Sequence, residues 1–355
     1  MRVLTVNPGS SSLKLSLLDA DDTVMETGSG DRLGDAVARM PAPDAVGLRF
    51  VHGGRDFAHP VVIDDEVAKR LHALIDLAPL HQPLSLYGLG EIGRALPGVP
   101  VVACFDTAFH TTLPEAAATY AVPVEWRERF GLRRYGFHGL SHAYAVRRAG
   151  ELLGLDPRTA RVVVCHLGSG ASLAAVRSGR SVDTTMGFTP IDGLVMATRA
   201  GSLDPGIPLW LLKHGVPEGE ISDALDHRSG LRALAGTGDM RQIQDAANGG
   251  DDLAASALDV YHHRLRACAA AMVAALGGLD ALVFTGGVGE HAPQVRRRAA
   301  DDLAFLGVAV DPGKNDAARG DADITASGSR VRTAVITARE DLEIAAGVRT
   351  ALAGR

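Results

Sequence analysis

Residues 4–13 of the chain read LTVNPGSSSL, and residues 163–173 read VVCHLGSGASL. Each stretch has an apolar run, a small polar turn and a second apolar run, which is typical of a β-hairpin. The simplest interpretation is a duplicated hairpin unit, one in each half of the chain, whose two turns face each other across a cleft and can surround a polyphosphate. Two unrelated hairpins are an equal alternative, because glycine and serine are common in any turn.

The rest of the chain alternates strand patterns with helix patterns. Short apolar runs end in turns at residues 3–6, 99–105, 161–165, 281–285 and 332–337. Alanine-rich stretches with helical spacing lie at residues 66–76, 142–153, 253–276 and 341–352. Interleaved strands and helices predict the α/β class. A length of 355 residues makes about two domains the natural expectation.

Composition excludes several classes of protein. With 46% hydrophobic and 22% charged residues, the chain is close to the globular average and far from fibrous or disordered proteins. Its 36 Lys and Arg against 42 Asp and Glu give a formal charge of −6, so we expect no broad binding to nucleic acid or to membranes. Three cysteines without CxxC spacing predict reduced core thiols.

The chain is expected to be cytoplasmic. It passes from Met1 and Arg2 directly into the first apolar run, without the apolar region and small-residue cleavage site of an export signal. The longest apolar run, residues 267–279, is shorter than the roughly 20 residues that span a bilayer, so it predicts a buried helix.

Residues 7–14, NPGSSSLK, supply what a phosphate clamp needs. Backbone N–H groups of small residues can approach an anion closely, and a nearby cation adds attraction. In a strand after the turn, Ser10, Ser12 and Lys14 alternate onto one face. We favour a phosphate-binding function for this segment, with an ordinary polar hairpin as the alternative.

Two further glycine clusters differ in their context. Residues 88–93 match GxGxxG, but no strand precedes them, so they predict helix and turn instead of a dinucleotide site. Residues 285–290, TGGVGE, follow an apolar run and precede a helical pattern, which suits a nucleobase or ribose lying on bare backbone. The chain has no GxxxxGKS or GxxxxGKT motif, which disfavours a P-loop NTPase.

Two acids each follow a predicted strand. Asp106 closes the run at 101–105, and Glu340 follows the run at 332–337. Carboxylates at the carboxyl ends of strands lie where α/β sites are built. Asp106 can be a Mg²⁺ ligand or a general base, and Glu340 can supply a second oxygen to a metal that keeps waters and phosphates. Either acid alone is also consistent with a helix cap.

Three cationic or imidazole side chains lie among small residues. Arg49 lies shortly before a Val-His-Gly-Gly segment, Arg199 precedes Ala-Gly-Ser, and His138 lies among glycines, with Gly136 two residues before it and Gly139 directly after it. The planar fork of arginine binds two oxygens at once, so it is a natural clamp for a phosphoryl group or a carboxylate. For each residue taken singly, a solvated loop is the alternative.

Taken together, these motifs resemble the acetate kinase family, from residue 1 to about residue 350. The motifs that carry the resemblance are residues 7–14, 49–54, 78–81, 105–110, 135–139, 166–170, 183–190, 198–199, 238–241, 284–290 and 337–340.

The resemblance implies an α/β fold of duplicated actin, sugar-kinase and heat-shock ATPase-like domains, which are ribonuclease H-like, around a nucleotide cleft. Residues 1–110 plus 342–355 would form the first domain, with the phosphate loop and the acceptor site. Residues 111–341 would form the nucleotide-binding domain.

The resemblance also implies a role for each matching residue. Asn7, Ser10, Ser12 and Lys14 would surround the phosphates and Mg²⁺, and Asn7, Asp106 and Glu340 would hold or organise the metal. Catalysis would rest on Asp106 and on Arg49, His138 and Arg199, which would hold the phosphoryl group. The nucleotide would contact His166, Gly168, Ser169, Gly170, Asp239, Met240, Arg241, Gly287, Val288 and Gly289, and the acid would contact Val51, Leu80, His81, Phe137 and Pro190.

The implied activity is Mg²⁺-dependent phosphoryl transfer between ATP and acetate, with Mn²⁺ as a second usable ion and a homodimer as the expected assembly. Propionate and butyrate are alternative acceptors. The same motifs also fit a sugar-type kinase with Asp106 as base, or a catalytically weak ATP-binding protein. Ser169 stands where the family usually has asparagine, so restoring that residue is expected to raise turnover.

Overall fold

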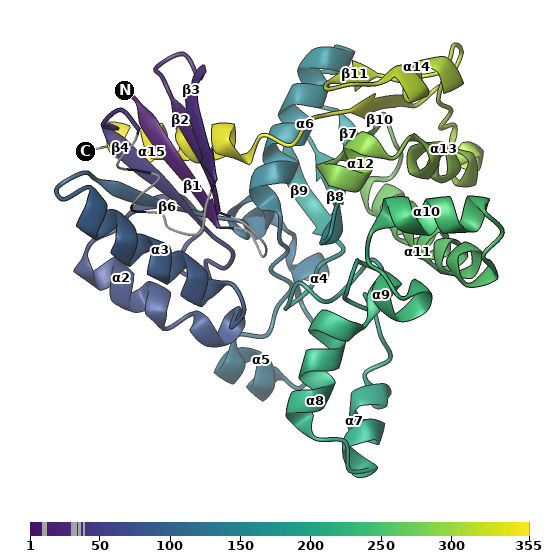
Figure 1. Cartoon of the computed structure of the whole chain (residues 1–355), viewed down its shortest axis with the longest axis horizontal. Coiled ribbons are helices and arrows are strands. Elements are labelled where there is room, and N and C mark those ends of the chain that lie inside the picture. The colour runs from purple at the N-terminus through teal and green to yellow at the C-terminus, as the bar shows by residue number, and fades with distance from the viewer. Residues whose placement is uncertain (9–12, 30–33, 35–36, 38–39, 355) are drawn as a thin grey trace. The chain divides into compact units, whose positions relative to one another are not determined.

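The computed structural model describes residues 1–8, 13–29, 34, 37 and 40–354. Its chain divides into two compact units (Figure 1). Unit 1 comprises Met1–Thr111, Phe137–Tyr144 and Arg339–Arg355, and unit 2 comprises Thr112–Gly136 and Ala145–Ala338. The sequence-based domains place residues 111, 137–144 and 339–341 differently. Contacts inside unit 1 explain this, since the backbone N–H of Gly139 donates to the carbonyl of Asp106.

Unit 1 is built on a mixed six-stranded sheet of order β3-β2-β1-β4-β6-β5. Its central strands β1, β4 and β6 are parallel, and β2, β3 and β5 are antiparallel to their neighbours. The strands are β1 (Val3–Pro8), β2 (Leu13–Leu18), β3 (Val24–Ser29), β4 (Ala45–Phe50), β5 (Val61–Val62) and β6 (Val101–Phe105).

Helices cover both faces of this sheet. Leu4 and Val6 of β1 belong to a core that includes residues of α2 and α3, while Val3 packs with Ile344 and Val348 of α15. Side chains of a strand alternate between faces, so a central strand buried on both sides is apolar throughout. The helices are α2 (Asp65–His72), η1 (Ile75–Leu77), α3 (Gln82–Ala95), η2 (Ala108–Thr112) and α15 (Glu340–Ala353).

Unit 2 repeats the same strand arrangement. Its sheet has the order β11-β12-β10-β7-β8-β9, in which β7, β10 and β12 are parallel and β7, β8 and β9 form consecutive antiparallel pairs. The strands β3-β2-β1-β4-β6-β5 of unit 1 correspond in order and direction to β9-β8-β7-β10-β12-β11 of unit 2. This correspondence confirms the predicted duplication. The strands are β7 (Arg161–Leu167), β8 (Ala171–Arg177), β9 (Arg180–Thr184), β10 (Ala281–Thr285), β11 (Ala322–Asp323) and β12 (Arg332–Val335).

Of the predicted buried helix at residues 267–279, residues 267–276 form the end of α11 (Asp252–Leu276), and Gly277 ends the helix. One face of this segment is buried, with Ala269, Met272 and Val273, and the other is exposed. No helix in the described part of the chain is long and apolar enough to span a membrane. The other helices that contain residues of unit 2 are α4 (Glu115–Ala118), α5 (Val124–Phe130), α6 (Gly139–Leu153), α7 (Gly206–Lys213), α8 (Glu218–Asp223), η3 (Ala224–Arg228), α9 (Gly230–Ala235), α10 (Met240–Asn248), α12 (Gly286–His291), α13 (Pro293–Asp302), η4 (Ala304–Leu306) and α14 (Pro312–Ala317).

The remaining sequence interpretations concern glycines and cysteines. Residues 88–93 lie inside α3, so the GxGxxG match is helical, as expected. Cys104 and Cys165 are buried free thiols in central strands, whereas Cys268 is free and only partly buried.

Candidate functional site

The carboxyl ends of three parallel strands place polar side chains at one edge of the unit 1 sheet. Asn7 lies near the end of β1, Arg49 near the end of β4, and Asp106 directly follows β6. The register pairs Val6 with Leu48 and Arg49 with Cys104, so these ends are level with one another. This edge is where ligands bind in open α/β sheets.

Arg49 is held at this edge by three side-chain hydrogen bonds. Its Nε and Nη2 donate to Oδ1 and Oδ2 of Asp106 at 2.9 and 2.5 Å, which makes a bidentate pair. Its Nη1 donates to Oδ1 of Asn7 at 2.8 Å. The Asn7 amide donates in turn to Oε2 of Glu340 at 2.6 Å, and that oxygen lies 3.8 Å from Arg49 Nη1. The structure therefore brings four predicted site residues into one network.

Burial and charge fix the state of this network. The side chain of Asp106 is 1% exposed, and those of Arg49 and Glu340 are 13% and 15% exposed. Burial raises the pKa of Asp106, Arg49 and the backbone N–H of His138 oppose that effect, and the charge of Glu340 adds to it. The pKa of Arg49 lies above its ordinary value, because the two acids outweigh the cost of burying its charge. Arg49 is thus a fixed cation that solvent still reaches.

His138 enters the same site with an uncommon backbone conformation. Its φ is +56°, in the left-handed region that few non-glycine residues adopt. Its carbonyl accepts from the backbone N–H of His142 at the start of α6. A Cβ on the next residue, Gly139, would lie 2.1 Å from the carbonyl oxygen of Asp106, so only glycine fits there. The backbone of residues 138–139 is therefore held directly against Asp106.

Lys14 lies opposite Asn7 in the β1–β2 pairing and is exposed. Directly opposed residues of an antiparallel pair place their side chains on the same face, so the ammonium lies on the Asn7 side of the sheet. Ser10 and Ser12, which were predicted to share that face, lie outside the described residues.

Four of the predicted acid-pocket residues belong to unit 1. Val51 and Phe137 are buried, Leu80 is 43% exposed, and His81 directly precedes α3. The fifth, Pro190, belongs to unit 2.

Two buried histidines that contact Phe137 were not predicted as site residues. The ring of His52 lies edge-on to that of Phe137 at 5.5 Å, and its Nδ1 accepts from the backbone N–H of Gly54. The Nε2 of His110 lies 3.0 Å from the carbonyl of Phe137. Burial lowers the pKa of each imidazole to about 4, so both are neutral at pH 7. Their only signal in the sequence is that they lie inside the motifs at residues 49–54 and 105–110.

In unit 2 the predicted nucleotide residues lie on two adjacent turns. Thr285, at the end of β10, is in register with His166 of β7. A Cβ on Gly168 would lie 3.8 Å from the backbone nitrogen of Gly287, and a Cβ on Gly286 would lie 2.8 Å from the Leu167 carbonyl. The turn at residues 166–170 and the start of α12 therefore lie side by side. Their glycines have no side chains, which leaves backbone atoms accessible there.

A third segment joins these turns. The backbone N–H of Ala197 donates to the carbonyl of Ser169 at 3.1 Å, and a Cβ on Gly238 would lie 2.9 Å from the Ala197 carbonyl. Asp239 then caps α10 by accepting from the N–H of Arg241. Met240 is buried, and Arg241 is exposed. Val288 and Gly289 follow Gly287 within α12.

Arg199 is the cation of unit 2 that the sequence singled out. Its Nη1 donates to the carbonyl of Pro190 at 2.8 Å. Burial lowers its pKa, and the negative charge of Asp226 opposes that effect. Within the described ranges of the chain, no carboxylate forms an ion pair with it. A half-buried guanidinium bonded to a neutral carbonyl is suited to an anionic ligand.

Comparisons with known proteins agree on one family. A sequence model of the acetokinase family matches residues 35–346. The chain is 47% identical over 311 residues to the acetate kinase of Nostoc punctiforme, and this alignment covers 87% of this chain and 76% of that one. It is 39% identical over 389 residues to the acetate kinase of Acetivibrio thermocellus, and this alignment covers 97% of this chain and 98% of that one.

Solved structures give the same result. The crystal structure of Porphyromonas gingivalis acetate kinase matches with a TM-score of 0.91 and 36% identity, and covers 99% of each chain. A propionate kinase from Francisella tularensis matches with a TM-score of 0.90 and 35% identity, and covers 98% of each chain.

Proposed function

Since the chain belongs to the acetate kinase (acetokinase) family, we propose that it transfers the terminal phosphoryl group of ATP to acetate, reversibly, which yields acetyl phosphate and ADP. The observation that carries the proposal is that Asn7 and Asp106 hold the Arg49 guanidinium in one orientation. Three bonds to Asn7 and Asp106 orient the guanidinium, which has more N–H groups than these bonds use. An ATP-dependent reaction also supports the expected cytoplasmic location.

The chemistry needs positioned cations more than it needs a base. The acceptor carboxylate is already ionised at neutral pH, so its oxygen attacks the terminal phosphorus without losing a proton. The bond from that oxygen to phosphorus forms, and the bond from phosphorus to the bridging oxygen breaks, with its electron pair leaving on ADP. Charge on the equatorial oxygens is then stabilised by cationic donors. We assign that work to Arg49, Arg199 and His138.

Asp106 acts by orienting Arg49. Both of its oxygens accept from the guanidinium, and it is almost completely buried. A sugar kinase needs a base that takes a proton from a neutral hydroxyl. Because Asp106 is committed to Arg49, its geometry favours a carboxylate acceptor over a sugar.

The acids of unit 1 fit the Mg²⁺ that this reaction uses. Mg²⁺ prefers oxygen ligands and usually takes one or two carboxylates together with waters and substrate phosphates. Glu340 offers a partly exposed carboxylate, which Asn7 orients through a 2.6 Å hydrogen bond. Among the described residues no group of three His, Cys, Asp or Glu could hold a metal by itself, which suits such an ion. Bound Mg²⁺, or Mn²⁺ in its place, would neutralise phosphate charge.

The nucleotide is assigned to the bare backbone of unit 2. Gly287, Val288 and Gly289 at the start of α12 and residues 239–241 at the start of α10 would contact base and ribose. His166, Gly168, Ser169 and Gly170 would contact phosphates from the turn of unit 2. Ser10, Ser12 and Lys14 would do so from the hairpin of unit 1.

The acceptor is assigned to the four apolar residues and the histidine that the family resemblance implies. Val51, Leu80, Phe137 and Pro190 would contact the alkyl end of the acid, and His81 would shape that site. One methylene in such a pocket changes specificity by only about 1–3 kcal/mol. The structural match to a propionate kinase makes propionate the first alternative to test.

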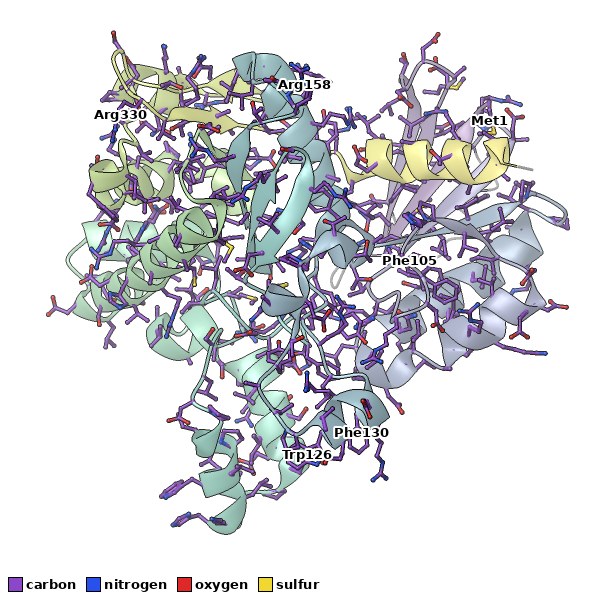
Figure 2. The ribbon with its side chains drawn as sticks, turned by 180° about the vertical axis from the view of Figure 1, so that it is seen from behind. Met1, Phe105, Trp126, Phe130, Arg158 and Arg330 are labelled. Atoms are coloured by element: carbon purple, nitrogen blue, oxygen red, sulfur yellow. The ribbon has the colours of Figure 1, made fainter. Side chains whose placement is uncertain are left out.

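We further propose that the protein is a homodimer that covers α7. This helix buries none of its residues although its sequence, GIPLWLLK, is largely apolar. Ile207, Leu209, Trp210 and Leu212 are 43–60% exposed, and a helix that is apolar all round is normally covered. Figure 2 labels two further exposed aromatics of unit 2, Trp126 and Phe130.

A second copy is the simplest partner because an isologous contact places the same patch on both chains. Light scattering is expected to show a dimer for the wild type and a monomer for Leu209→Glu. A monomeric wild type would reject the dimer.

The activity is tested by trapping the product. Acetyl phosphate reacts with hydroxylamine to give a hydroxamate, which forms a coloured complex with added ferric iron, so Mg-ATP with acetate, propionate or butyrate is expected to give signal. Arg49→Met is expected to lose it, while Arg158→Met, which changes an exposed arginine paired with Asp156, is expected to keep it. No hydroxamate from any of the three acids would reject the proposal. Nucleotide binding without transfer would instead favour a non-catalytic ATP-binding protein.

A further inference from the structure

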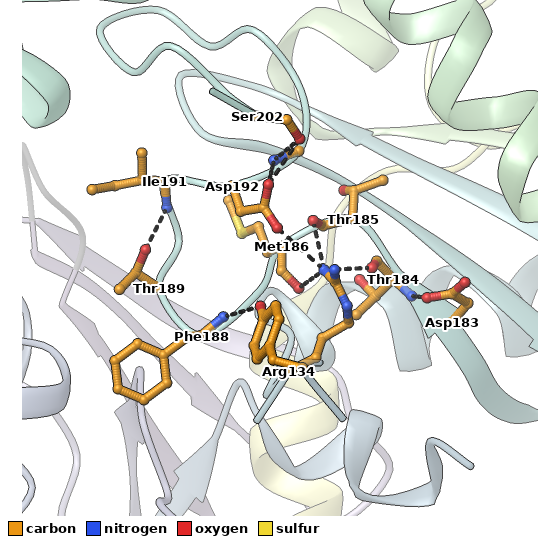
Figure 3. Close-up of polar contacts among 12 residues, drawn as sticks. Arg134, Asp183, Thr184, Thr185, Met186, Phe188, Thr189, Ile191, Asp192 and Ser202 are labelled. Carbon is orange, nitrogen blue, oxygen red and sulfur yellow. Dashed lines mark hydrogen bonds and ion pairs between the residues drawn. The ribbon is translucent and has the colours of Figure 1, made fainter. Parts of the chain in front are cut away.

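Arg134 lies among four converging oxygens of unit 2. Its Nη1 donates to the carbonyls of Thr184, Thr185 and Met186 at 3.1, 3.0 and 3.0 Å (Figure 3). The same nitrogen lies 3.5 Å from Oδ2 of Asp192. Three consecutive carbonyls that point to one place repel one another, so this curl of the chain needs a cation at its centre. The side chain is 21% exposed, which leaves the interaction largely unscreened.

These contacts fix both ends of one loop. At the first end, Thr185 is also tied to β8, because its Oγ1 accepts from the N–H of Leu173. At the second end, Oδ1 of Asp192 accepts from the N–H of Gly193 and from the hydroxyl of Ser202 (Figure 3). Residues 187–191 therefore form a loop whose two flanking residues, Met186 and Asp192, both contact the Arg134 guanidinium.

The loop is also held from the Arg134 side. The backbone N–H groups of Tyr135 and Gly136 donate to the Gly187 carbonyl at 3.1 and 3.4 Å. The hydroxyl of Tyr120 accepts from the N–H of Phe188 at 2.8 Å, and the guanidinium of Arg134 lies 5.7 Å from the Tyr120 ring. A Cβ on Gly187 would lie 2.2 Å from that hydroxyl, so the packing leaves no room for movement toward Tyr120.

The loop carries one residue of the proposed reaction and contacts a second. Pro190 lies in its middle, and the Pro190 carbonyl accepts from Nη1 of Arg199 at 2.8 Å. That bond is the contact by which this loop orients the Arg199 guanidinium. A displaced loop would therefore move a pocket residue and a phosphoryl-binding arginine together.

We propose that Arg134 is a positioning residue, which sets the place of Pro190 and the direction of Arg199 by collecting the carbonyls of residues 184–186 and the carboxylate of Asp192. The inference rests on the proposed function, because it assigns Arg199 and Pro190 to that reaction. Arg134 itself touches neither substrate nor the reacting atoms.

The test compares three variants of the full-length protein. Arg134→Met keeps the stem but loses the donors, whereas Arg134→Lys keeps the charge and a donor group that can bond several carbonyls. Arg158→Met is the matched control, since Arg158 is exposed and pairs only locally with Asp156. Steady-state kinetics with acetate and with ATP are measured for each, and circular dichroism checks the fold.

Arg134→Met is expected to lower kcat/KM for acetate by about 100-fold, the size expected for a catalytic group displaced by roughly 1 Å. The KM for ATP is expected to stay within about twofold, because the residues assigned to base and ribose lie on other segments. Arg134→Lys is expected to recover most of the loss, and Arg158→Met to match wild type. Hydrogen exchange is expected to rise at residues 187–191 in Arg134→Met only.

The outcomes separate the two proposals. If wild type and Arg158→Met make no hydroxamate, the proposed function fails. If wild type is active and Arg134→Met has the same acetate kinetics, or if acetate and ATP constants worsen equally, the positioning role is wrong. Should Arg134→Met fail to fold, Tyr120→Phe decides: it removes only the acceptor of the Phe188 N–H, and an unchanged kcat/KM for acetate would overturn the inference.

Discussion

Replacing Asp106 by asparagine removes one charge from the buried pair at the edge of the unit 1 sheet. The carboxylate is 1% exposed and accepts two hydrogen bonds from Arg49, so the amide would turn an N–H donor toward a guanidinium. Breaking a buried ion pair on one side usually costs roughly 3–5 kcal/mol. We expect about 3 kcal/mol, at the lower end of that range, because Arg49 is 13% exposed and keeps Glu340 at 3.8 Å.

The matched control is Asp44→Asn in the same unit. Asp44 pairs with Arg2, but the two side chains are 49% and 42% exposed, so water screens the pair and the change is expected to cost much less stability than Asp106→Asn. Guanidinium chloride unfolding followed by circular dichroism gives both free energies. Hydroxamate formation is expected to fall by about 100-fold for Asp106→Asn, since Arg49 loses its orientation, and to stay unchanged for Asp44→Asn.

A double variant separates stability from activity. Arg49→Met with Asp106→Leu removes both charges and is expected to be more stable than Asp106→Asn, since apolar residues of similar volume can replace a buried pair without loss. It is nevertheless expected to be inactive. The reasoning is refuted if Asp106→Asn costs no more than Asp44→Asn, or if the double variant still phosphorylates acetate.

Three further predictions concern the metal, the second turn and pH. Glu340→Gln is expected to raise the Mg²⁺ concentration for half-maximal rate by roughly tenfold, because an amide replaces a carboxylate ligand, and EDTA is expected to abolish the wild-type rate. Ser169→Asn is expected to raise kcat by up to about tenfold, the value of one added hydrogen bond to a charged phosphate, and a fall in kcat at saturating ATP would contradict this. His110 has a pKa of about 4 in the folded chain against 6.5 unfolded, so its stability contribution is full above pH 6.5 and is lost as pH falls toward 4, by roughly 3 kcal/mol. His110→Gln, which can still donate to the Phe137 carbonyl, is expected to reduce the loss of urea unfolding free energy over that range by this amount, while the part due to His52 and His262 remains.

Two of the three strands that carry the unit 1 site, β1 and β6, could be predicted from sequence, because buried strands are short apolar runs. The ends of parallel strands meet, so Asn7 and Asp106 were expected at one edge of a sheet. The strand β4, which carries Arg49, was not among the predicted runs. The sequence did not show that Asp106 commits both oxygens to Arg49. That pairing depends on the register of Arg49 with Cys104, and an apolar pattern does not specify register between strands that are far apart in the chain.

Arg134 shows a different reason why a site residue escapes sequence analysis. Residues 124–134 read VEWRERFGLRR, a charged stretch that is typical of a solvated surface. The partners of Arg134 are mainly backbone carbonyls, and every residue type has one, so no pattern of side chains marks where three of them converge. Arg49 could be singled out because small residues follow it in the sequence. An arginine that acts through carbonyls is found only by asking where the backbone oxygens of a curled segment find their donors.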